Sequence, residues 1–170
     1  MADILKNLFK EYTGRGAQSV VELPSSGSHR RYFRLSGGDG SLIGVIGTCR
    51  EENNAFIVEA KHFAEQGIRV PKVFLVSEDG MCYIQEDLGS VLLYDAIKQG
   101  RENGEYSSYE RGLLCRTIEK LPKIQFKGAK GLDFSVCYPD PAFDGRMVMY
   151  DLNYFKYCFL KPTELDFHEL

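Results

Sequence analysis

Hydrophobic and polar residues follow two different periods along the first half of the chain, and these periods predict alternating helices and strands. Residues 3–13 place apolar side chains at helical spacing, with Gly14 beyond them as a stop signal. Residues 17–24 predict a strand, and a loop of small residues leads to a second strand at 32–36. A GGDG turn then leads to a third strand over 41–49.

A helix and a hairpin are predicted next. Asn53 or Asn54 is placed to cap a helix that runs to about Gln66, with a glycine after it as a stop signal. Two further strands, 70–77 and 81–89, are separated by a Glu-Asp-Gly turn. The predicted order is therefore three strands, one main helix and two strands, preceded by a short helix.

The second half of the chain has a different pattern, which predicts helices and no strands. A short helix is expected over 91–100 and a longer one over 108–122. Residues 126–142 contain glycines and prolines without periodicity, which indicates an ordered but irregular loop, and 143–160 predict a last helix. Together the two halves predict an α+β protein: a five-stranded antiparallel sheet with one main helix, followed by a helical segment.

Composition narrows the class of protein. The chain has 170 residues, of which 44% are hydrophobic, and its formal net charge is −3. This balance argues against a chain built mainly to bind nucleic acid. No apolar run approaches the roughly 20 residues that a membrane-spanning helix needs. The N-terminus carries acidic residues and no small-residue cleavage site, so we expect a cytoplasmic protein with no membrane partner.

The cysteines do not indicate a disulfide framework or a zinc site. Their number is odd, and none forms a C-x-x-C pair. We expect reduced and mostly buried thiols. The five cysteines are Cys49, Cys82, Cys115, Cys137 and Cys158.

Four local motifs occur in an order that is typical of one enzyme family. They are GSHRRYFRL, FIVEAKHFAEQGIRVPKVFLV, YIQEDLG and FDGRMVMYDLNYFKYCFL, within about residues 15–160. In this order they resemble the N-terminal part of the aminoglycoside phosphotransferase and choline kinase-like family, in particular bacterial kinases that phosphorylate the anomeric hydroxyl of N-acetylmuramate and N-acetylglucosamine. The resemblance implies a protein kinase-like N-terminal nucleotide-binding lobe with its hinge over 1–89. Residues 90–170 would be the start of a helical C-terminal substrate lobe, which is incomplete.

The loop after the first strand is the candidate phosphate-binding segment. Its small residues allow backbone N–H groups to reach anionic oxygens, and the arginines that follow can donate charge-assisted hydrogen bonds to phosphate. An ordinary hairpin loop with solvated arginines is the alternative. The candidate residues are Ser26, Gly27, Ser28, His29, Arg30 and Arg31.

The motif RRYFR combines basic and aromatic residues, as surfaces that bind nucleic acid do. Strand alternation places Tyr32 and Arg34 on one face and Arg31, Phe33 and Leu35 on the other. The aromatic side chains are therefore divided between two faces and form no common stacking platform. We expect no nucleic-acid partner.

Glu59 is the candidate acidic residue of the main helix. It borders the apolar stripe of that helix, where a carboxylate requires a cationic partner. Protein kinases use a third-strand lysine, which also holds the nucleotide phosphates, but residues 41–49 contain no lysine or arginine. We expect Arg31, or less readily Arg30 or Arg50, to replace it. A solvated helix glutamate is the alternative.

By the same resemblance, the motif QEDLG would be the hinge of the nucleotide site. Backbone groups, and not side chains, read the adenine edge there, so the resemblance assigns the segment and not single atoms. The alternative is a strand end followed by an Asp-capped segment. The hinge residues are Gln85, Glu86, Asp87 and Leu88.

No catalytic machinery is found in the sequence. The family has a catalytic loop of the pattern H-G-D-x-x-x-x-N and then an Asp that holds magnesium. The three histidines are His29, His62 and His168, and none begins such a loop. We therefore expect ATP and Mg²⁺ as cofactors, with the Mg²⁺ ligands outside this fragment, and we assign no catalytic or metal-binding residue.

Three functions remain open on the sequence alone. The first is the ATP-binding lobe of an enzyme that phosphorylates a hydroxyl of a small acceptor, with an amino sugar as one candidate; the fragment itself would be inactive. The second is a catalytically dead kinase-like module that binds nucleotide or protein. The third is an α+β interaction domain without a nucleotide site. The apolar last helix also favours self-association.

Overall fold

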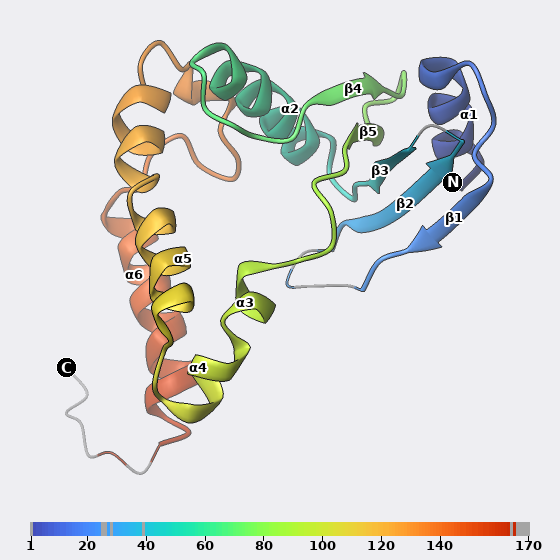
Figure 1. Cartoon of the computed structure of the whole chain (residues 1–170). Coiled ribbons are helices and arrows are strands. Elements are labelled where there is room, and N and C mark those ends of the chain that lie inside the picture. The colour runs from blue at the N-terminus through green and yellow to red at the C-terminus, as the bar shows by residue number, and fades with distance from the viewer. Residues whose placement is uncertain (1, 25–26, 28, 39, 164, 166–170) are drawn as a thin grey trace.

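The protein folds as an antiparallel sheet with one helix on each face, followed by a series of helices (Figure 1). The computed structural model describes residues 2–24, 27, 29–38, 40–163 and 165. The elements of the sheet half are α1 (Ala2–Thr13), β1 (Ser19–Glu22), β2 (Arg31–Gly37), β3 (Gly40–Ile46), α2 (Arg50–Glu65), β4 (Val73–Val76) and β5 (Cys82–Glu86). The helical half contains α3 (Leu93–Ala96), α4 (Lys98–Asn103), α5 (Ser108–Ile118), η1 (Lys123–Gly128), η2 (Phe134–Val136), α6 (Gly145–Phe155) and η3 (Lys156–Leu160).

The strands form one sheet in the order β1-β2-β3-β5-β4, and every neighbouring pair is antiparallel. Strand β5 therefore lies between β3 and β4, and the connection from β3 to β4 contains α2. The predicted α+β class, the five-stranded antiparallel sheet and the main helix after the third strand are confirmed. The order also places the end of β5 beside the start of β3, which creates the candidate hinge described below.

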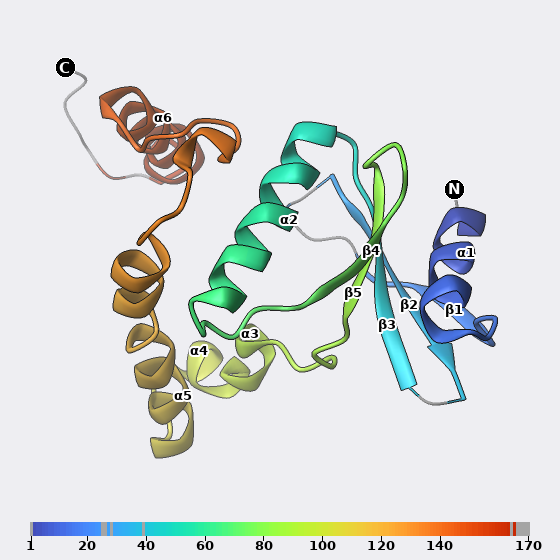
Figure 2. The ribbon, with the colours of Figure 1, turned by 90° about the horizontal axis from the view of Figure 1, so that it is seen from above.

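Helix α1 covers one face of the sheet and α2 covers the other (Figure 2). On the α1 side, Leu5 and Phe9 pack with Phe33 and Leu35 of β2. On the α2 side, the buried centre is Ile43, Val45 and Tyr83, with Phe56 and Ile57 of α2 packed against it. Alternation along β2 thus sends Phe33 to the α1 face and Tyr32 to the α2 face, as its period of two predicts.

Two glycines near the end of the third strand have packing roles. A Cβ on Gly44 would lie 2.6 Å from Leu35 Cδ1 and 2.9 Å from Leu5 Cδ1, so these core side chains occupy the space that a larger residue would need. At Gly47, the Asn53 side chain occupies the corresponding space. The glycines therefore allow α1 and α2 to approach the sheet closely.

The predicted start of α2 is wrong by several residues. The helix begins at Arg50 after an extended Cys49, and Asn53 lies inside it instead of capping it. The buried Asn53 amide donates hydrogen bonds to the carbonyl oxygens of Gly80 (3.0 Å) and Met81 (3.1 Å). A side chain that binds the β4–β5 turn is thus unavailable as a cap, which local sequence alone does not reveal.

The helical half contacts the sheet half through α2. His62 Nε2 donates a hydrogen bond to the carbonyl oxygen of Gly128 (2.8 Å). A Cβ on Gly128 would lie 2.9 Å from the Phe63 ring and 3.1 Å from Ile68, so the glycine allows η1 to pack against the end of α2. Helices α5 and α6 overlap in Figure 1 but lie apart in Figure 2.

The expectation of mostly buried thiols is also wrong. Of the five cysteines, all free, only Cys82 is buried; Cys49 and Cys137 are half-buried, and Cys115 and Cys158 are exposed. Cys82 lies in the sheet, whereas the two exposed thiols lie in α5 and η3 of the helical half. That half leaves much of its apolar surface uncovered, so an apolar residue type does not imply burial there.

Candidate nucleotide-binding site

A buried arginine joins the loop after β1 to helix α2. Arg30 is only 9% exposed, although it lies immediately before β2. Its guanidinium forms an ion pair with Glu52 (3.1 Å) and donates to the Glu52 carbonyl oxygen (3.0 Å). It also lies over the Phe56 ring, 5.3 Å from the centroid. Because burial of an arginine is costly without partners, these contacts fix it against the first turns of α2.

The neighbouring Arg31 points to a different partner. It makes an exposed bidentate pair with Glu22 of β1 (2.7 and 2.8 Å), which lowers the pKa of Glu22. In this structure the expected pair of Arg31 with Glu59 is not formed. Glu59 is half-buried and lies beside Cys137, whose thiol pKa is raised by burial and by the Glu59 carboxylate. The pairing expected for Arg31 stays a prediction for the nucleotide-bound protein.

The rest of the predicted phosphate loop is only partly described. Gly27 and His29 are both exposed. Ser26 and Ser28 lie outside the described residues. The described part of the loop therefore supplies an exposed glycine and an exposed histidine, next to a pair of arginines of which one is buried and one is exposed.

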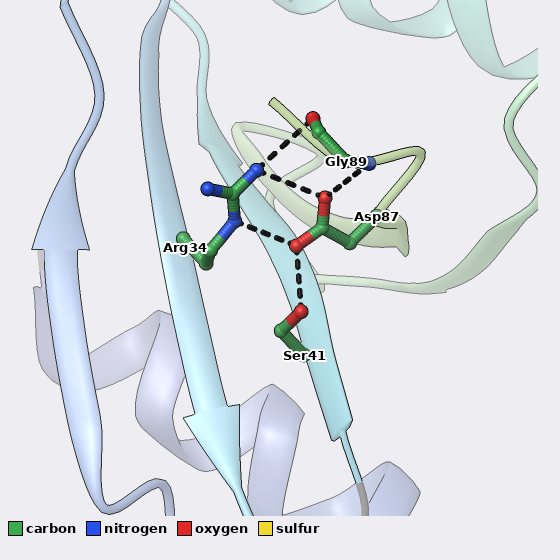
Figure 3. Close-up of polar contacts among 4 residues, drawn as sticks. All are labelled: Arg34, Ser41, Asp87 and Gly89. Carbon is green, nitrogen blue, oxygen red and sulfur yellow. Dashed lines mark hydrogen bonds and ion pairs between the residues drawn. The ribbon is translucent and has the colours of Figure 1, made fainter. Parts of the chain in front are cut away.

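An acidic residue at the end of β5 organises the candidate hinge (Figure 3). Asp87 accepts two hydrogen bonds from Arg34 of β2, from Nε (2.6 Å) and from an Nη (3.1 Å). It also accepts from the Ser41 hydroxyl (2.6 Å) and from the backbone N–H of Gly89 (2.9 Å). The same Arg34 nitrogen donates to the Gly89 carbonyl oxygen (3.0 Å). The hinge is thus tied to β2 and β3 at four points.

The environment of Asp87 strongly favours its charged form. Its side chain is only 6% exposed, and that of Arg34 is 27% exposed. The hydrogen bonds from Arg34 outweigh the effect of burial and lower the pKa of Asp87 to about 2. The carboxylate is therefore ionised at neutral pH, where it is paired with Arg34.

The remaining hinge residues differ in how open they are. Gln85 is 9% exposed and faces α2, because it alternates with Ile84 on β5. The Glu86 N–H donates to the Lys72 carbonyl oxygen (2.8 Å), so it belongs to the sheet. The Leu88 side chain is 57% exposed, and within the described part of the chain its N–H donates to no protein group. Leu88 thus offers an unpaired backbone donor in an exposed part of this segment.

Two groups of site residues lie towards opposite ends of the paired strands β2, β3 and β5. Arg30 and its α2 partner Glu52 form the charged group, while Gln85 to Leu88 form the hinge group. Sequence reasoning missed Glu52 and Arg34. Alternation along β2 gave the face of Arg34, but only the pairing of β2, β3 and β5 brings it to Asp87.

No model of a known protein family matches the sequence, and a search of curated proteins also finds no match. Among the described residues, no group of three or more His, Cys, Asp or Glu side chains is arranged to hold a metal ion. None of the helices in the described ranges is long and apolar enough to cross a membrane. The local motifs and the contacts of Arg30 and Asp87 are therefore the features that bear on function.

Proposed function

We propose that residues 1–89 are the nucleotide-binding lobe of a small-molecule phosphotransferase of the aminoglycoside phosphotransferase and choline kinase-like type. The nucleotide is ATP with Mg²⁺, and the acceptor is a hydroxyl of a small molecule, for which an amino sugar is the candidate class. In this proposal these residues supply nucleotide binding, and no catalytic loop or Mg²⁺ ligand is assigned among the 170 residues.

The buried Arg30–Glu52 pair carries this proposal. Protein kinases hold the nucleotide phosphates with a lysine on the third strand that pairs with a glutamate of the helix after that strand. Here the third strand has no such lysine, but a buried arginine pairs with the equivalent helix, on the α2 side of the sheet. The sheet order and the place of α2 between β3 and β4 support the same assignment.

The residues present fit a nucleoside triphosphate. Arg30 carries a positive charge beside a loop whose Gly27 is open to solvent, which suits polyphosphate oxygens. The open Leu88 N–H suits a ring nitrogen of the adenine edge, and the Arg34–Asp87 pair holds that segment still. Bound Mg²⁺ would neutralise phosphate charge, and none of the described residues is assigned to it.

Calorimetric titration of Mg-ATP into the 170-residue chain tests the proposal. We expect binding that Arg30→Ala weakens about tenfold, because one charge-assisted hydrogen bond to phosphate is lost. The matched control is Arg116→Ala on α5, which removes the same charge from an exposed position and should leave the affinity within twofold. The Mg-ATP affinity of Arg31→Ala, measured in the same way, compares the contribution of the exposed arginine with that of the buried one. If neither the fragment nor a longer polypeptide binds Mg-ATP, the nucleotide-binding proposal fails.

A binding module without catalysis is the second candidate, and the surface of the helical half supports it. Large apolar side chains of α6 and η3 are exposed, among them Met149, Leu152, Phe155 and Phe159. Such a surface favours a protein partner or self-association. Acceptor-dependent phosphate transfer by a longer polypeptide would support the enzyme, whereas nucleotide binding without transfer would support the module.

A further inference from the structure

A cavity lies where the two halves of the chain meet. Its volume is about 540 Å³, and it is bounded by the turn between α2 and β4, by the hinge, and by the segment from α5 to η1. Four of its lining residues are cations, namely Arg69, Lys120, Lys123 and Lys127. Ile68, Leu88 and Ile124 supply apolar surface, and no Asp, Glu or aromatic residue lines it.

Local packing fixes the walls of this cavity, which we call the basic pocket. Gly128 lets η1 lie against Phe63 and Ile68, and His62 binds the Gly128 carbonyl oxygen. Gly67, with φ of +68°, turns the chain at the end of α2, and a Cβ there would lie 3.5 Å from Lys127 Nζ. Lys123 and Lys127 of η1 therefore line the same cavity as Arg69, which follows this turn.

The cations of the basic pocket have no ion-pair partner in the part of the chain that the structure describes. The chain as a whole carries a net charge of −3, so its overall composition does not account for this local concentration of positive charge. Like charges that face one concave site repel one another, and a multivalent anion between them relieves the repulsion.

We propose that the basic pocket binds a small phosphorylated molecule, a phosphate ester or a polyphosphate. The volume lies within the range of small-molecule sites, about 300 to 1,000 Å³, and the apolar lining suits the organic part of such a ligand. Single-stranded nucleic acid fits less well, because its binding sites need aromatic stacking platforms and an extended charged groove.

The basic pocket lies away from the phosphate end of the proposed nucleotide site and shares Leu88 with its hinge end. Glu52 lies near the start of α2, and Gly67 lies just after its end. At 1.5 Å per helical residue, the Arg30–Glu52 pair and the basic pocket are roughly 20 Å apart along the helix. This inference therefore goes beyond the proposed function, although Leu88 borders both regions.

Titration of inorganic pyrophosphate into the 170-residue chain, in Mg²⁺-free buffer of fixed ionic strength, tests the proposal. The variant Lys123→Gln/Lys127→Gln removes two charges from the basic pocket. The control Lys10→Gln/Lys130→Gln removes two charges from exposed positions outside it. We expect the first variant to weaken pyrophosphate binding at least about tenfold, and the control to change it less than about twofold.

Four outcomes would overturn the proposal that the basic pocket binds a phosphorylated molecule. The first is that the intact chain does not bind pyrophosphate. The second is an equal loss in both variants, which would indicate attraction by net charge alone. The third is binding that only Arg30→Ala weakens, which would place the anion at the nucleotide loop. The fourth is tighter binding of a single-stranded oligonucleotide that both lysine variants weaken, which would indicate an extended nucleic-acid surface. Loss of Mg-ATP binding alone would overturn the nucleotide proposal and not this one.

Discussion

Replacing Asp87 by asparagine should lower the free energy of unfolding, because it removes the charge that ties the hinge to Arg34. The contacts of Asp87 lower its pKa from 3.8 to about 2. Each pKa unit corresponds to about 1.4 kcal/mol, so the charged form is favoured by about 2 kcal/mol in the folded chain. Asparagine keeps the shape but loses the charge that faces Arg34. We expect Asp87→Asn to lower the free energy of unfolding by about 2 to 3 kcal/mol.

The same shift fixes how this contribution depends on pH. The pKa of Asp87 is lower in the folded chain than in the unfolded chain, where it is about 4. Its contribution is therefore fully present above about pH 4 and is lost as the pH falls towards about 2. The difference in stability between the intact chain and Asp87→Asn should be constant near neutral pH and should shrink over that acidic window.

Urea denaturation followed by circular dichroism at several pH values measures both effects. The matched control is Glu22→Gln, which also removes one carboxylate charge from an arginine pair. Because both partners of that pair are exposed, solvent screens it and the change should be much smaller. Equal changes in the two variants at neutral pH, or a difference for Asp87→Asn that persists below pH 2, would refute the reasoning.

Two glycine substitutions test the packing between the elements. Gly44→Ala should destabilise the chain by about 1 to 3 kcal/mol in urea denaturation, because buried leucines occupy the space for its Cβ; Gly16→Ala, which meets open space, is the control. Gly128→Ala should raise hydrogen exchange in η1 while the sheet stays protected, because its Cβ would push η1 away from α2. Gly145→Ala is the control there, and equal exchange in both variants would contradict the packing role.

Most of the sheet half could be predicted from sequence, because its signals are local. Period-two alternation and turn residues predict the strands, and the helical period between the third and fourth strands predicts α2. The order in which strands pair is not a local property. The Arg34–Asp87 pair joins residues 53 positions apart, and it exists only because β5 pairs with β3. For the same reason, Asn53 could be mistaken for a cap until the position of the β4–β5 turn was known.

The helical half was predicted less well because few of its side chains are buried. Between residues 90 and 163, the buried residues are Ile97, Gly100, Glu110 and Gly128. So little burial cannot define a core, and the periodic pattern then indicates a helix without indicating what the helix packs against. The last predicted helix accordingly divides into α6 and η3, and the irregular loop contains the short turn η2.

Helix α2 is consequently the element that relates the two candidate sites. Its first turns hold Arg30 through Glu52, and its last turn holds η1 through His62. The helical half contains too few buried side chains to fix its own position, so its contacts with α2 are a main constraint on the basic pocket. A ligand at one end would affect the other end only by favouring one position of α2 over another. Such coupling would have to be equal in both directions, because it is a property of one shared equilibrium.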